Sequence, residues 1–484
     1  MTNELAFRPN FLFFFPDQHR PDWVPWKEWW GSAAGSSVAR QDLPLRMPNL
    51  ARIAARGVRF TRAVCPSPLC APSRACLASG REYERCGVPG NQADYPLDQP
   101  TYYQALRAAG YRVAGVGKFD LHKATLDWGL DGSRLLKEWG FTEGIDNEGK
   151  LDAIASYLGA RRLGDQTSPG ARGTPRGPYM AYLQRRGLAE THVTDFQGRR
   201  GPHGHYRTHP TPLPDDAYCD NWIAENGLRF LRAFPPGQPW HLVVNFTGPH
   251  SPMDVTAAMH ARWQGVRFPP PVTEAPLDQE AREGHQAIRQ NYAAMLENID
   301  RQIGRFLDVV RERGELERTV IVYSSDHGEM LGDHGRWGKS TFYQPSVGVP
   351  LVVAGPGIQQ GVASDALVST HDLAATFLDL AGLPPLPGMD SQSLAPVLAG
   401  RAASHRPYVR SGLDPWRMVF DGRYKLVRGV PGHRGGGVAP QLFDLAEDPW
   451  EMRDLAGERP AEVARLAALL TADARVSRAS EEEG

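Results

Sequence analysis

The sequence lacks several features that would assign it to a broad class of proteins. Five cysteines in 484 residues are sparse and odd in number, which indicates reduced thiols and not a disulfide framework. The 54 basic and 55 acidic side chains leave no positive excess, so composition gives no support for a nucleic-acid partner. We find no internal repeat and no coiled-coil heptad. The length predicts one large domain and a smaller one.

Long apolar runs are also missing. The segment Met1–Pro9 has neither the basic nor the hydrophobic part of a secretory signal. The apolar run Phe11–Phe15 is far too short to span a membrane. We therefore expect a soluble, cytoplasmic protein with no membrane association, and the sequence leaves a homo-oligomer open.

Short apolar runs do recur, and polar residues follow each of them. Such runs are typical of strands that are buried on both faces of a parallel sheet. Ligands bind at the carboxyl ends of the strands in open α/β sheets. The sequence therefore predicts an α/β fold with a large mixed, mostly parallel sheet flanked by helices. The runs are 10–16, 111–117, 240–246 and 319–325, followed by Asp17-Gln18, Lys118, the turn 247–252 and Asp326-His327.

Periodicity and caps predict helices over 47–57, 101–110, 215–234 and 286–313, with Asp215 or Asp216 near the cap of the third. From about 144 to 214 the chain is rich in Gly, Arg and Pro and has little periodicity, which predicts an insert outside the sheet. Beyond about 400, segments 424–427 and 441–445 predict antiparallel strands. We thus expect a large domain over 1–400 and a smaller C-terminal α+β subdomain over 401–484.

The segment Cys65–Arg81 carries the most chemical information. Pro72 sets the first turn of a predicted helix, so Cys70 lies where unpaired backbone N–H groups stabilise an anion. Arg74, about one turn further on, is placed to hold both a nucleophile and an anionic substrate. A buried or redox cysteine is the alternative. A metal cluster of Cys70, Cys76 and Cys86 is a further one, although the spacing is not that of a C-x2-C zinc site.

Cys70-Ala-Pro-Ser-Arg74, followed by Gly80, resembles the signature of the sulfatase family. Cys65 also precedes a proline, but Leu69 stands where the pattern needs arginine, so only Cys70 fits. The resemblance implies an alkaline-phosphatase-like fold. It also implies that a formylglycine-generating enzyme oxidises Cys70 to formylglycine. The hydrated aldehyde then attacks sulfur with one oxygen and keeps a second hydroxyl, whose deprotonation expels sulfate.

The same resemblance implies a site for one divalent metal ion. Asp-Gln after the first strand and Asp-His before Gly-Glu are similar to the family's metal-binding dipeptides. Gln18 stands where a second aspartate is commoner and lowers the negative charge by one. Oxygen ligands favour Ca²⁺, and the nitrogen of His327 keeps Mn²⁺ open. The implied ligands are Asp17, Gln18, Cys70 as formylglycine, Asp326 and His327.

Further side chains match family positions that contact the sulfate ester. Lys118 and Lys339 match two sulfate-binding lysines, and His250 in Pro-His-Ser-Pro matches the residue beside the bridging oxygen. The family histidine that follows the first lysine falls on Asp120 here, so equating it with His122 assumes a local shift. The implied catalytic residues are Cys70, Arg74, Lys118, His122, His250 and Lys339.

These residues predict a sulfatase that releases inorganic sulfate and an alcohol or phenol. Phosphonate monoester or phosphodiester hydrolases share the fold, the formylglycine and both metal dipeptides, but tend to lack the Gly-Lys motif. A two-metal phosphatase would need more ligands than these motifs supply. A non-catalytic member would have lost a ligand or the nucleophile, and none is missing. Aryl, choline and sugar sulfates all remain open as substrates.

Two further clusters each allow two interpretations. The tryptophans form either an aromatic wall for the substrate or a packing or subunit contact. The histidines form either a metal cluster or part of a solvated loop. They are Trp23, Trp26, Trp29 and Trp30, and His203, His205 and His209.

Overall fold

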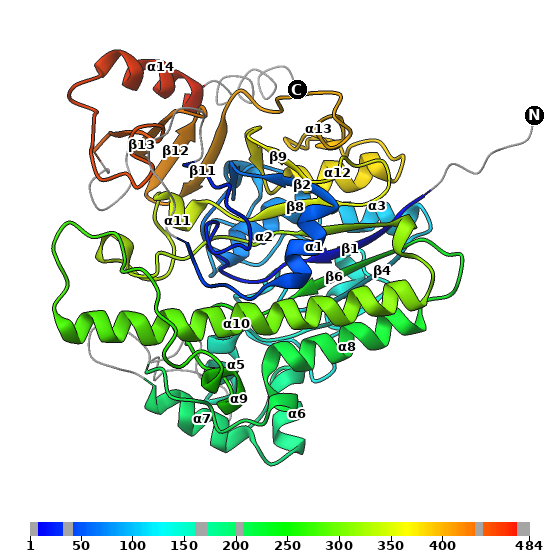
Figure 1. Ribbon diagram of the computed structural model, residues 1–484. Helices are drawn as coiled ribbons and strands as arrows, with labels where there is room; N and C mark the ends of the chain where they lie inside the picture. Colours follow the sequence, from blue (N-terminus) through cyan, green and yellow to red (C-terminus); the bar gives the residue numbers. More distant parts are fainter. Residues whose placement is uncertain (1–7, 32–41, 160–171, 200–206, 431–438, 472–484) are drawn as a thin grey trace, which may run out of the picture.

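The computed structural model describes residues 8–31, 42–159, 172–199, 207–430 and 439–471, and its centre is an eight-stranded sheet (Figure 1). In order across the sheet, the strands are β5 (Glu143–Asp146), β4 (Arg112–Gly117), β6 (Trp240–Asn245), β1 (Asn10–Phe14), β7 (Thr319–Tyr323), β8 (Leu351–Ala354), β2 (Gly57–Phe60) and β9 (Val362–Ser364).

The sheet is mixed and mostly parallel, as predicted. β1 pairs in parallel with β6 and β7, so that Phe11 lies opposite His241 and Val320. β4 is parallel to both β5 and β6, whereas β8 runs antiparallel to β7 and β2. The carboxyl ends of β1, β4, β6 and β7 therefore meet at one edge.

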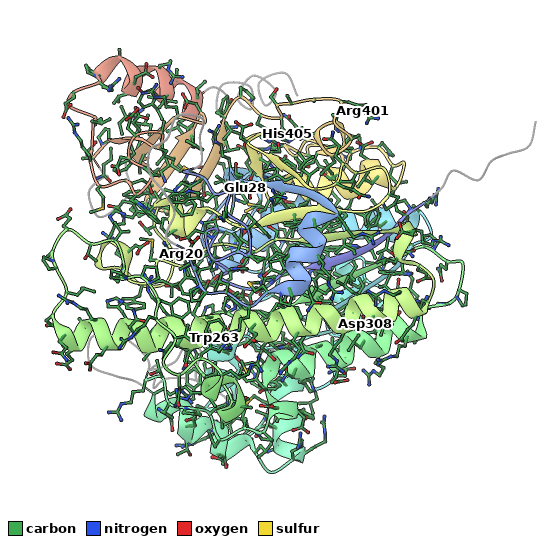
Figure 2. The ribbon with its side chains drawn as sticks, viewed as in Figure 1. Arg20, Glu28, Trp263, Asp308, Arg401 and His405 are labelled. Carbon is green, nitrogen blue, oxygen red and sulfur yellow. The ribbon has the colours of Figure 1, made fainter. Side chains whose placement is uncertain are left out.

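Side chains alternate along β1, so the two faces of the sheet contribute to two cores. Phe11 and Phe13 lie in one core, and Leu12 and Phe14 in the other. Asp308 marks the long helix α10 that covers the second face, and Trp263 lies beside this helix and donates to its Glu297 (Figure 2). The helices of the second face are α1 (Pro48–Ala55), α8 (Cys219–Ala233), α9 (Ala257–Ala261) and α10 (Gln279–Glu312).

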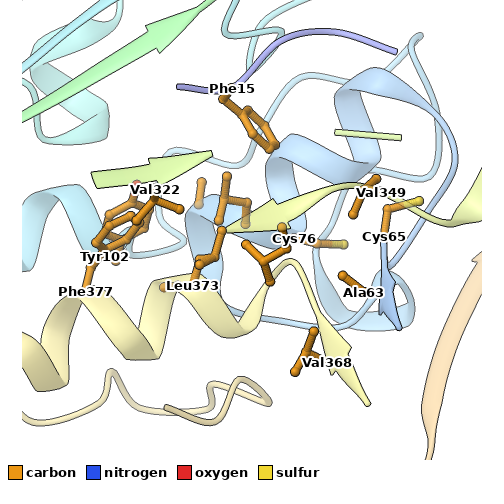
Figure 3. Packing of buried hydrophobic residues seen from close by; sticks show 14 of the residues in the cluster. Phe15, Ala63, Cys65, Cys76, Tyr102, Val322, Val349, Val368, Leu373 and Phe377 are labelled. Atoms are coloured by element: carbon orange, nitrogen blue, oxygen red, sulfur yellow. The ribbon is translucent and has the colours of Figure 1, made fainter. Parts of the chain in front are cut away.

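The opposite face packs under α2 (Cys70–Ser79), α3 (Tyr102–Ala108) and α12 (Asp372–Leu380). Figure 3 shows Tyr102 and Phe377 of this core beside Val322 of β7, and the two rings stack with centroids 5.3 Å apart. Cys76 lies in the same core, which fixes the helix that begins with Cys70 against the sheet. Short elements join these layers: β3 (Ala63–Val64), α4 (Leu136–Trp139), α11 (Gln344–Val347), β10 (Val368–Ser369) and α13 (Ala395–Leu398).

The segment 144–214 differs from its prediction. It begins inside strand β5, which pairs with β4, and therefore does not lie wholly outside the sheet. Most side chains of this edge strand are half-buried, so the strand lacks the apolar run that marks central strands. The rest of the described segment contains three helices: α5 (Lys150–Tyr157), α6 (Pro178–Arg185) and α7 (Ala189–Gly198).

The helix predicted over 215–234 is also divided. Asp215–Ala217 forms a separate 3-10 turn, and α8 begins only at Cys219 because Tyr218 is extended. Asp215 and Asp216 therefore belong to that turn and not to the cap of α8.

The C-terminal part contains the predicted antiparallel sheet. Its strands lie in the order β11 (Val409–Leu413), β12 (Trp416–Phe420), β13 (Tyr424–Gly429) and β14 (Gln441–Asp444). Helix α14 (Pro460–Thr471) packs on β12 and β13. Among the described helices, none combines the length and apolar character needed to cross a membrane.

Candidate active site

Four buried side chains meet at the carboxyl edge of the large sheet. Asp17 follows β1, Asp326 and His327 follow β7, and Cys70 opens α2. One potential ligand atom from each lies within 4.8 Å of the others. The sequence separates these residues widely, but the parallel pairing of β1 with β7 brings them together.

The donor set fits a cation. His327 Nδ1 lies 3.0 Å from the carbonyl oxygen of Gly328 and therefore carries the ring proton, which leaves Nε2 as an acceptor. Nε2 lies 3.7 Å from Oδ1 of Asp17 and 3.7 Å from Oδ1 of Asp326. Three acceptors held this close together repel one another, so a positive charge between them stabilises the group. Two carboxylates and an imidazole are suitable ligands for a divalent ion.

The Cys70 sulfur lies beside this cluster. Sγ is 3.3 Å from His327 Nε2 and 3.9 Å from Asp17 Oδ1. Burial and the Asp17 charge both raise the pKa of the Cys70 thiol, but the charges of Lys118 and Lys339 outweigh them and lower it to about 5. The site thus stabilises a negative charge at residue 70.

Arg74 and Lys118 supply positive charge behind the cluster. Arg74 Nε donates to Asp326 Oδ2 at 2.9 Å, and its Nη1 donates to Asn245 Oδ1 at 3.2 Å. Lys118 Nζ contacts the carboxylate of Asp17. Burial would raise the pKa of Asp17, but the charges of Lys118, Lys339 and Arg74 hold it well below its usual range. The predicted pair of cations therefore lies within contact of the predicted metal ligands.

Gln18, His250 and Lys339 form the side that faces the cavity. Lys339 Nζ lies 2.5 Å from Oε1 of Gln18 and 2.6 Å from His250 Nε2. His250 Nδ1 donates to the carbonyl oxygen of Ser251 at 2.5 Å, which leaves Nε2 to accept from Lys339. Burial and the Lys339 charge lower the pKa of His250 well below its usual value. The amide nitrogen of Gln18 donates to Glu329, which sequence analysis had not singled out.

His122 does not reach the cavity. Its ring lies 5.3 Å from that of Trp139, and its Nε2 lies 3.1 Å from the carbonyl oxygen of Asp127. His122 is therefore not among the predicted site residues that the structure brings to the cavity. Asp120 has a φ of 54°, and after this turn Lys123 lines the cavity instead.

A cavity of about 330 Å³ opens above Cys70. The sequence did not predict the part of its wall that Asn91, Lys123 and residues 149–152 form, because those residues belong to no recognisable motif. The lining residues are Gln18, Cys70, Asn91, Lys118, Lys123, Gly149, Lys150, Leu151, Asp152, His250, Ser251, Gly338, Lys339 and Ser340. A larger hollow of about 530 Å³ lies between α1, α9 and α10, but none of the predicted site residues lines it.

Trp23, Trp29 and Trp30 of the N-terminal loop are buried and Trp26 is half-buried, and none of the four lines this cavity. Trp23 stacks on Phe268, and Trp29 and Trp30 pack against Trp450. The local-packing interpretation is therefore the one that the structure supports. Of the three histidines, His209 pairs with Asp195 at 2.9 Å, while His203 and His205 lie outside the described residues.

The comparison with protein families decides the assignment. The family model named Sulfatase matches residues 30–383. The chain belongs to the sulfatase family. This confirms the predicted family, and a second model, named N-sulphoglucosamine sulphohydrolase, C-terminal, matches residues 332–475 of this sulfatase.

Individual relatives are distant but match over most of their length. A choline-sulfatase from Rhizobium meliloti is 28% identical over 85% of this chain and 78% of its own. An N-acetylglucosamine-6-O-sulfatase from Bacteroides thetaiotaomicron is 26% identical over 93% of this chain and 81% of its own. A solved phosphonate monoester hydrolase from Silicibacter pomeroyi is 25% identical, covers 97% of this chain and 95% of its own, and has a TM-score of 0.73. The alkaline-phosphatase-like fold is thus confirmed.

Proposed function

We propose that this sulfatase hydrolyses sulfate esters with an oxygen nucleophile made from Cys70. The observation that carries the proposal is the position of Cys70, at the start of α2 and 3.3 Å from His327 in a cluster rich in acceptors. A thiol is a soft nucleophile that suits sulfate esters poorly. Conversion to formylglycine by a separate maturation enzyme would supply a hydrated aldehyde, hence a hard oxygen nucleophile.

The metal site would be formed by Asp17, Gln18, residue 70, Asp326 and His327. Ca²⁺ is the ion that we propose, with Mn²⁺ as the alternative because of the imidazole nitrogen. When bound, a divalent ion supplies positive charge beside the nucleophile and the sulfate group.

The surrounding side chains then hold charge and protons in place. Lys118 and Lys339 border the cavity and would neutralise the oxygens of the transferred sulfate. Arg74 keeps Asp326 in position through its Nε–Oδ2 bond. Lys339 donates a proton toward His250 Nε2, so this pair is placed to protonate the leaving alcohol.

Mass spectrometry after co-expression with a maturation enzyme tests the nucleophile. We expect conversion of Cys70 and of no other cysteine, together with sulfate release that Cys70→Ala abolishes. Cys219→Ala, at a buried cysteine that starts α8, is the matched control and should keep its activity. An unmodified thiol at position 70 in active protein would overturn the mechanism.

Phosphonate monoester hydrolysis is the second candidate, since both metal dipeptides and the similar hydrolase structure favour it. Lys118 separates the two functions. Sulfate offers three non-bridging oxygens to cations, whereas a phosphonate replaces one of them with carbon, which accepts no hydrogen bond.

We expect Lys118→Ala to lose about ten- to a hundredfold in kcat/KM for a sulfate ester, and less for the matched phosphonate. Measurement of both substrates on both proteins decides this. An unchanged ratio would remove Lys118 as the discriminating residue, and a wild-type preference for phosphonate would favour the second candidate. The cytoplasmic location and a homo-oligomeric state stay predictions.

A further inference from the structure

One wall of the active-site cavity has no part in the chemistry proposed above. It consists of Lys123 and the beginning of α5, residues 149–152. Lys123 Nζ lies 2.8 Å from Asp120 Oδ2 and 2.6 Å from Asp152 Oδ2. We call Lys123 and Asp152 the wall pair. Their side chains are only 10% and 19% exposed, so these charges are held in fixed positions.

Gly149 allows this wall to approach the catalytic lysine. A Cβ atom added at Gly149 would lie 2.8 Å from Cε of Lys118 and 3.1 Å from Oδ2 of Asp152. The first turn of α5 therefore lies directly against Lys118. The wall pair therefore lies within reach of the alcohol half of an ester whose sulfate group contacts Lys118.

The lining restricts the chemistry of that alcohol. The described residues that line the cavity include no Phe, Tyr or Trp, and Leu151 is the one large aliphatic side chain among them. The cavity therefore lacks the apolar surface that binds phenyl groups in other proteins. A quaternary ammonium group is normally held by aromatic rings, and Asp152 already pairs with Lys123.

Charge restricts it further. Lys123 lies between two carboxylates, and Lys150 pairs with Asp254 at 2.7 Å, so the wall carries no surplus of positive charge. A second anionic group on the alcohol would find no unpaired positive charge in this wall to attract it. Hydroxyl groups, in contrast, both donate and accept hydrogen bonds, and an ion pair offers them a carboxylate acceptor beside ammonium donors.

We propose that the Lys123–Asp152 pair selects sulfate esters of neutral polyhydroxylated alcohols, such as sulfated sugars. The pair binds hydroxyl groups of the leaving alcohol, Asp152 as acceptor and Lys123 as donor. This inference rests on the proposed sulfatase function and adds the substrate class to it.

Three esters test the inference: glucose 6-sulfate, choline sulfate and 4-nitrophenyl sulfate, each assayed by sulfate release with the matured full-length enzyme. Wild type should give its highest kcat/KM with glucose 6-sulfate after correction for the more reactive nitrophenyl leaving group, using the uncatalysed rates. Asp152→Ala should lower kcat/KM for glucose 6-sulfate, relative to 4-nitrophenyl sulfate, by about ten- to a hundredfold, mainly through KM.

Asp152→Asn, which is nearly isosteric, repeats the test if the alanine variant does not fold. Asp216→Ala removes an exposed carboxylate that pairs with Arg186 outside the cavity, and is the matched control. An equal loss on all esters, or a corrected wild-type preference for choline or nitrophenyl sulfate, would overturn the inference while the sulfatase function stands. Release of sulfate from none of the three would overturn the proposed function and the inference together.

Discussion

Two buried groups of ion pairs behave in opposite ways in this molecule. In the active site, Lys118 contacts Asp17 and Asp120, and together with the Cys70 charge these carboxylates raise its pKa although burial would lower it. In the C-terminal part, Lys425 contacts Glu451, and both side chains are fully buried. There burial prevails, so the pKa of Lys425 is lowered and that of Glu451 is raised.

The number of opposite charges explains the difference. One partner does not offset the cost of removing an ammonium group from water, whereas several partners do. Lys118 therefore stays charged, which binding and transfer of an anion require. The C-terminal pair joins two parts of the chain, because Lys425 Nζ also donates to the carbonyl oxygen of Phe342 at 2.7 Å.

The largest effect is expected at the C-terminal pair. Glu451→Gln leaves Lys425 buried without its counter-charge and should lower the free energy of unfolding by about 3–5 kcal/mol. The double variant Lys425→Met/Glu451→Gln removes both charges and should recover most of this loss. Denaturant unfolding of both variants measures it, and a double variant as unstable as the single one would contradict this account.

The next effect concerns the cluster at the sheet edge. Asp326 accepts hydrogen bonds from the backbone of Gln18, from Arg74 and from His327, so Asp326→Ala removes a charge on which three partners converge. We expect bound metal to be lost and kcat/KM to fall by more than about a hundredfold. Metal analysis and sulfate release measure this on folded protein, and full metal content with normal turnover would refute the assignment.

A pH experiment extends the comparison to a buried group with no counter-charge. Burial lowers the pKa of His241 to about 3, from an ordinary value near 6.5 in the unfolded chain. The imidazole is neutral in the folded state, so protonation of His241 takes nothing from the free energy of unfolding above pH 6.5. Below pH 6.5 the unfolded chain binds a proton that the folded protein does not. The free energy of unfolding therefore falls as the pH drops from 6.5 toward 3, by up to about 1.4 kcal/mol per pH unit.

His241→Gln should flatten the curve of unfolding free energy against pH in that window. His260→Gln, on the partly exposed surface of α9, serves as the control and should follow wild type. Equal slopes for wild type and His241→Gln would show that other groups cause the acid sensitivity.

The smallest effect is expected for a pair in solvent. Asp308 and Arg311 on α10 lie 2.7 Å apart, and more than half of each side chain is exposed. Water screens such a pair, so Asp308→Ala should change the free energy of unfolding by less than about 0.5 kcal/mol. Thermal or denaturant unfolding measures this change. A loss above about 2 kcal/mol, which is on the order of the effect at a buried pair, would show that burial does not explain the difference between the pairs.

These contrasts also show how far the sequence predicts the molecule. The central strands were predictable, because burial on both faces leaves a continuous apolar run such as 10–16. The residues after them were predictable as a group, since parallel strands deliver their carboxyl ends to one edge. Strand β5 was not, because its partly exposed side chains leave no such run.

The wall of the cavity was beyond prediction for another reason. Lys123 and Asp152 meet through a contact between a loop and a helix, and neither lies in a motif that fixes their distance. The positive φ of Asp120 decides that Lys123, and not His122, enters the cavity. Most residues avoid such a backbone conformation, and the neighbouring residues form no pattern that predicts it.

The position of β1 at the centre of the sheet has a consequence for biosynthesis. On one side, this strand forms its backbone hydrogen bonds with β7. About 300 further residues must therefore be synthesised before this pairing can form, which takes roughly 15–60 s at ordinary rates of translation. Cys70 is only 2% exposed once the sheet has closed. The oxidation that we propose for this cysteine can therefore take place during translation, when the sheet has not yet formed and the thiol is accessible to the maturation enzyme.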